Sequence, residues 1–170
     1  GVPLLVVLFE IPLLNKAYGD LMIRSHANFN YMFFWISGFA FFAFFTNLIR
    51  EIIKDTEDFE GDSAYGMHTV PISFGIKWTK ILLGFLIVII VVLLTLVLRF
   101  IMLSAEETDL ISAGYFIFFL IIPFSILFYM IFIADSKKDY HNASILIKFI
   151  MLTGILYAVV VRYIVLHQLN

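Results

Sequence analysis

The chain has 170 residues, of which 62% are hydrophobic and only 14% are charged. Soluble domains are about 45–50% apolar and about 25% charged, so this composition excludes an ordinary soluble domain and indicates an integral membrane protein. The formal net charge of −2 gives no sign of a basic surface, and we expect no nucleic-acid partner. The absence of cysteine excludes disulfides, thiolate nucleophiles and cysteine metal sites.

Long apolar stretches predict helices that cross a lipid bilayer, because lipid offers the backbone no hydrogen-bond partners. They cover residues 1–14, 29–49, 81–103, 113–134 and 145–166. The first would reach only about 21 Å as a helix against a bilayer core of about 30 Å, so we expect it to be part of a longer span. These stretches predict an all-α integral membrane fold, with one transmembrane domain over 1–170 that is incomplete at its N-terminus.

The basic residues divide between the two ends of these spans. Threading the spans in order gathers most of them on one side: Arg50, Lys54, Lys77, Lys80, Lys137, Lys138 and Lys148. The opposite side carries Lys16, Arg24, Arg99 and Arg162. By the positive-inside rule the first side faces the cytoplasm.

An acidic cluster follows the 29–49 span on that cytoplasmic side. If the helix continues, Glu51, Asp55, Asp58 and Asp62 recur at steps of four, three and four and share one face. Such a row of carboxylates repels itself unless a cation neutralises it. Magnesium is commonly held by one or two carboxylates while substrate phosphates complete its shell. The row therefore predicts a magnesium site for a phosphorylated ligand at the membrane surface.

Basic residues close to the row predict further contacts with such a ligand. Arg50, Lys54 and Lys77 could bind the remaining phosphate oxygens of a diphosphate, although positive-inside topology alone would also explain each of them. For Lys80 the topological explanation is favoured.

The stretch 55–80 is the longest between predicted spans. Gly66, Pro71 and Gly75 indicate a shaped loop, which we expect to cap the site on the cytoplasmic face. A solvated linker is the alternative. In the predicted span 113–134, Pro123 predicts a kink.

The pattern Asp55-x-x-Asp58-x-x-x-Asp62, followed by Gly66, by Thr69-Val70-Pro71 and by Gly75, resembles the second aspartate-rich motif of the UbiA intramembrane prenyltransferases. The later run from Asp139 to Ser144, with Lys148, is similar to the end of bacterial members. The resemblance covers essentially the whole chain and is strongest between Arg50 and Gly75.

The resemblance implies a nine-helix, all-α membrane enzyme of which this chain is the C-terminal part. It implies magnesium-dependent transfer of a polyprenyl group from a prenyl diphosphate to a lipophilic acceptor, either aromatic or of the glycerol-phosphate type, in a bacterial inner membrane. Asp58 and Asp62 match the most dependable metal ligands, with Asp55 next, while Glu57 and Glu60 fall off the common face. The first aspartate-rich motif is absent from the sequence, so we expect the chain alone to be inactive.

A membrane transporter or cation-binding membrane protein is the alternative. Such proteins place ionisable residues near the middle of their spans. Here the acid row lies at the end of a span, and only Glu10 stands deep in an apolar run.

Overall fold

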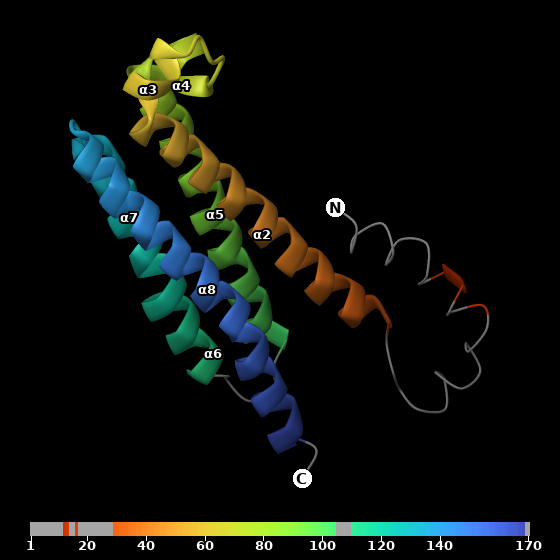
Figure 1. Ribbon diagram of the computed structural model, residues 1–170. Coiled ribbons are helices and arrows are strands. Elements are labelled where there is room, and N and C mark those ends of the chain that lie inside the picture. Colours follow the sequence, from red (N-terminus) through yellow and green to blue (C-terminus); the bar gives the residue numbers. More distant parts are fainter. Residues whose placement is uncertain (1–11, 14–15, 17–28, 105–109, 169–170) are drawn as a thin grey trace. The chain divides into compact units, whose positions relative to one another are not determined.

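The computed structural model describes residues 12–13, 16, 29–104 and 110–168 of the chain. All regular elements among them are helices (Figure 1): α2 (Phe29–Glu57), α3 (Phe59–Ala64), α4 (Val70–Phe74), α5 (Ile76–Ser104), α6 (Leu110–Tyr115), the π-helix η1 (Phe116–Ile121), α7 (Ile122–Ile133) and α8 (Lys137–Gln168). The chain divides into two compact units, Gly1–Phe44 and Phe45–Asn170. Apart from residues 12 and 13, the predicted partial span 1–14 lies outside the described residues.

The described helices confirm an all-α membrane protein. Segments long and apolar enough to cross a membrane are Ile36–Glu57, Ile76–Phe100, Leu110–Ile133 and Lys137–Val161. Each overlaps one of the predicted spans between residues 29 and 166. In the first unit, Phe41 and Phe44 on α2 are exposed, as suits side chains that face lipid.

The core of the second unit forms where α7 packs against α5 and α8. Its fully buried side chains recur at helical spacing within each helix: Leu83 and Ile87 on α5, Phe124, Leu127 and Ile131 on α7, Ile147 and Ile150 on α8. Gly84 allows close packing of α5 on α7, because a Cβ atom there would lie 2.9 Å from Cε2 of Phe132. Small residues have this role at many helix interfaces in membranes.

Pro123 sits at the start of α7, directly after the π-helix η1. Proline has no N–H, so it cannot donate to the carbonyl of Phe119 four residues earlier. The hydroxyl of Thr153 on α8 donates to that carbonyl at 3.1 Å and so replaces the missing donor. The proline is thus accommodated by a local π-helical turn and a side chain from the neighbouring helix.

The stretch 55–80, predicted as a loop, is largely helical. Helix α2 continues to Glu57, α3 and α4 follow, and α5 begins at Ile76. The turns fall at the two glycines with positive φ, Gly66 (67°) and Gly75 (81°). After α3, Met67 N–H donates to Asp62 C=O and Gly66 N–H to Ser63 C=O, which is the Schellman arrangement that favours glycine at this position.

Candidate functional site

The acid row keeps its helical spacing although α2 ends within it. Asp58 N–H donates to Lys54 C=O at 3.0 Å and Asp62 N–H donates to Asp58 C=O at 3.0 Å, so i to i−4 bonding runs across the junction with α3. Asp55 lies close enough to Asp62, Glu51 and Asp58 to interact electrostatically with all three. The structure therefore brings the predicted row together at the α2–α3 junction.

The row by itself is an incomplete metal cage. Within the described residues, no group of three or more histidine or acidic side chains is arranged to hold a metal ion. Asp55, Asp58 and Asp62 are each partly exposed, so their oxygens can reach a ligand above the surface. Because Mg²⁺ retains waters and phosphate oxygens beside one or two carboxylates, a partial, open donor set fits that ion.

The predicted phosphate-binding cations differ in their surroundings. Arg50 pairs with its neighbour Glu51. Lys54 is exposed beside Asp55, and Lys77 is exposed in the first turn of α5. Lys80 instead reaches the end of α7, where its Nζ lies 3.4 Å from the carbonyl oxygen of Phe132 and 3.4 Å from Asp135 Oδ1. This contact ties α5 to the end of α7, which positive-inside topology alone did not predict for Lys80.

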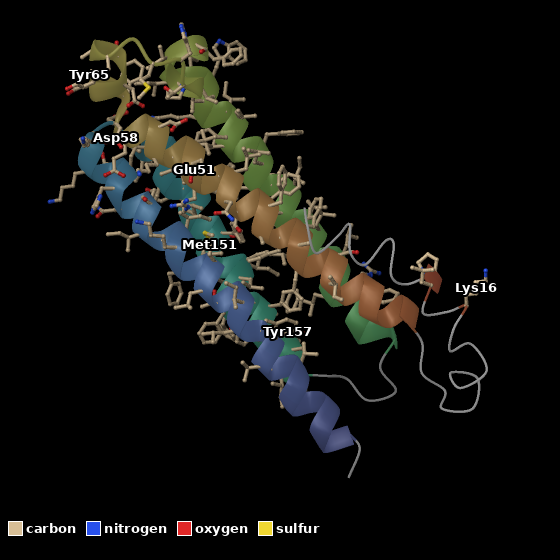
Figure 2. The ribbon with its side chains drawn as sticks, turned by 45° about the vertical axis from the view of Figure 1, so that its right-hand side comes forward. Lys16, Glu51, Asp58, Tyr65, Met151 and Tyr157 are labelled. Carbon is tan, nitrogen blue, oxygen red and sulfur yellow. The ribbon has the colours of Figure 1, made fainter. Side chains whose placement is uncertain are left out.

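The first turns of α8 meet the acid row, which the sequence did not predict. Lys137 Nζ lies 3.3 Å from Asp58 Oδ1 and His141 Nδ1 lies 2.8 Å from Glu57 Oε1. Figure 2 shows Asp58 beside the beginning of α8. Glu57 is off the face of the row, yet its side chain is only 16% exposed because His141 lies against it. Two carboxylates of the α2–α3 junction are therefore held by one face of α8.

A capping box fixes that end of α8. The Asp139 carboxylate accepts hydrogen bonds from Ser136 N–H at 2.9 Å, Ser136 Oγ at 2.7 Å and Asp135 N–H at 3.1 Å, and Asp139 N–H donates to Ser136 Oγ at 3.4 Å. This reciprocal bonding begins the helix at Lys137 rather than at residue 145, where the predicted span began. The Ser-x-x-Asp spacing was the signal in the sequence that could have located it.

An apolar groove lies where α4 meets α5. It encloses about 290 Å³ and is lined by Val70, Phe74, Trp78, Thr79 and Leu82. Phe74 and Trp78 are both largely exposed. Aromatic side chains at this level of a membrane helix are typical of the interface with the headgroups.

Comparisons with known proteins identify archaeal relatives. A digeranylgeranylglyceryl phosphate synthase of Thermococcus kodakarensis is 36% identical over 128 residues, which is 72% of this chain and 43% of the relative. That of Korarchaeum cryptofilum is 45% identical over 58 residues, covering 34% of this chain and 20% of the relative. That of Methanopyrus kandleri is 61% identical over 33 residues, or 19% of this chain and 12% of the relative.

The chain thus spans less than half the length of each of these relatives. No family model matches the chain, and no solved structure gives a significant match. The three relatives are archaeal, which gives no support to the expected bacterial membrane.

Proposed function

Because this chain is homologous to the digeranylgeranylglyceryl phosphate synthases, which are UbiA-family prenyltransferases, we propose that it supplies half of a prenyl-transfer site. The resemblance predicted from the acid row is confirmed by these relatives. The proposed reaction is magnesium-dependent transfer of a polyprenyl group from a prenyl diphosphate to a glycerol-phosphate-type acceptor. The observation that carries the proposal is the row of Asp55, Asp58 and Asp62, held together at the end of a membrane-spanning helix.

The proposed roles follow from the charges at the site. Asp55, Asp58 and Asp62 hold Mg²⁺, and Arg50, Lys54 and Lys77 bind phosphate oxygens. When bound, the metal neutralises the diphosphate as its charge develops. In the transfer, the bond between the prenyl carbon and the diphosphate oxygen breaks, and diphosphate leaves with the electron pair. The acceptor oxygen forms the new bond to that carbon and loses its proton.

We further propose that the chain alone does not turn over. The resemblance implies two aspartate-rich motifs, and this sequence carries only the second. The three carboxylates of the row are each partly exposed, so the row is open to ligands from elsewhere. The row also faces the cytoplasm in this proposal, because the basic residues gather at that end of the spans.

The acceptor is proposed from the relatives. The relatives are digeranylgeranylglyceryl phosphate synthases, which favours a glycerol-phosphate lipid over an aromatic acid. It also favours an enzyme over the transporter considered above.

A transfer assay with the full-length protein tests the proposal. It uses geranylgeranyl diphosphate with either a glycerol-phosphate lipid or an aromatic acid, with Mg²⁺ or with a chelator. We expect Asp58→Ala and Asp62→Ala to lower kcat/KM at least about a hundredfold, as loss of electrostatic stabilisation does elsewhere. Glu60→Ala, an exposed carboxylate outside the row, is the matched control. Equal activity in all variants, or transfer that persists in the chelator, would reject the metal role.

A further inference from the structure

The contact between Lys137 and Asp58 joins two segments that are far apart in the sequence. Lys137 begins α8, and Asp58 is the central carboxylate of the Asp55, Asp58 and Asp62 row. The Nζ to Oδ1 distance is 3.3 Å, with the two side chains 70% and 42% exposed. An ion pair this exposed contributes little to stability, so stability alone gives no reason for its position.

The start of α8 that carries Lys137 is anchored, whereas the side chain of Lys137 is 70% exposed. The capping box between Ser136 and Asp139 fixes the start of α8. Tyr140 is buried, with 4% of its surface exposed. His141, one helical turn after Lys137 and on the same face, holds Glu57 at 2.8 Å. These four neighbours of Lys137 thus anchor the helix, while its own flexible stem presents a positive charge to the acid row.

We propose that Lys137 is a diphosphate-binding residue of the prenyl-transfer site. This inference rests on the function proposed above. Without ligands, the ammonium group neutralises Asp58. With Asp58 engaged by a divalent cation, the ammonium group of Lys137 would be released and would bind a phosphate oxygen of the diphosphate. Lysine binds phosphate as a mobile point charge, which suits a group that must change partners.

The adjacent Lys138 offers a matched control. It has the same charge and is also exposed, but one residue along a helix turns the side chain by about 100°. It therefore lies on a different face from Lys137 and His141. A general attraction of the basic surface for anions would involve both lysines, whereas the proposed role belongs to Lys137.

The test measures the Kd of geranylgeranyl diphosphate for the full-length protein at saturating Mg²⁺. We expect Lys137→Ala to weaken binding about tenfold, the effect of losing one charge-assisted hydrogen bond. Lys137→Arg retains most of the affinity, and Lys138→Ala changes it less than about twofold. The KM of the acceptor stays unchanged in Lys137→Ala, and so does the unfolding midpoint, because the ion pair is exposed. The tenfold loss of diphosphate affinity is the readout that a merely structural ion pair would not change.

Asp58→Ala separates this inference from the function on which it rests. If Asp58→Ala abolishes Mg²⁺-dependent binding while Lys137→Ala behaves like Lys138→Ala, the role of Lys137 is overturned and the metal role of the row survives. If Asp58→Ala retains full Mg²⁺-dependent binding, the proposed function fails, and the role of Lys137 fails with it. A loss in Asp58→Ala with the tenfold weakening in Lys137→Ala alone supports both.

Discussion

Replacing Thr153 by valine removes the hydroxyl that compensates for Pro123. Thr153 is 4% exposed, and its single hydroxyl proton is shared between Phe119 C=O at 3.1 Å and Ile150 C=O, in its own helix, at 3.0 Å. The Phe119 carbonyl then loses its interhelical donor inside the membrane. Interhelical hydrogen bonds in membranes contribute about 0.6 kcal/mol on average and at most about 1.7 kcal/mol. Since this carbonyl has no N–H from residue 123, we expect a cost near the upper value, about 1.5 kcal/mol.

Thr95→Val is the matched control, because Thr95 is exposed and its Oγ1 donates only within its own helix, to Val91 C=O at 2.8 Å. We expect it to change the free energy of unfolding by less than about 0.5 kcal/mol. Unfolding in mixed detergent micelles, followed by circular dichroism, measures both variants.

A double-mutant cycle with Pro123→Ala tests the cause of the effect. Alanine restores a backbone N–H near the Phe119 carbonyl, so Thr153→Val should cost about 1 kcal/mol less in that background. The reasoning is refuted if Thr153→Val costs no more than Thr95→Val, or if its cost is the same with proline and with alanine at position 123.

Three further predictions concern the free energy of unfolding. Gly66→Ala should cost about 1 kcal/mol because Gly66 has a φ of 67°, whereas Gly61→Ala, within α3 and in open space, should be neutral or stabilising; equal effects would contradict the Schellman turn. Ser136→Ala should cost about 1 kcal/mol and Ser136→Gly only a few tenths, as expected at an N-cap. Gly84→Leu should lower the free energy of unfolding by about 1–3 kcal/mol, because the larger side chain forces Phe132 away from α5. Gly84→Ala should lower it less, because the Phe132 ring can shift. A neutral Gly84→Leu would show that the helices do not pack closely there.

Apolar runs and helical periodicity predicted the features that lie within a single helix. The apolar runs indicated the membrane-spanning helices, and steps of three and four placed Asp55, Asp58 and Asp62 on one face. The role of Pro123 was only partly predictable. A proline indicates a missing hydrogen bond, but the sequence does not say that Thr153 replaces it.

The contacts of α8 with the acid row show why the rest could not be predicted. Glu57 was set aside because it lies off the common face, yet His141 of α8 lies 2.8 Å from its carboxylate. The partners Lys137 and His141 are 79 and 84 residues away in the sequence from Asp58 and Glu57. Their pairing depends on how α7 and α8 return to the end of α2, which no local pattern records. The loop prediction for 55–80 was wrong over most of its length because glycines and a proline marked only the turns between short helices.

Binding of a prenyl diphosphate as a function of Mg²⁺ concentration tests the metal role of the acid row most directly. The measurement compares the full-length protein with its Asp58→Ala and Asp62→Ala variants, using a thiolodiphosphate analogue that does not react. We expect Mg²⁺ to strengthen binding in the unchanged protein and to have no effect in either variant. Mg²⁺-dependent binding that survives both substitutions would contradict the assignment of the row to metal and diphosphate.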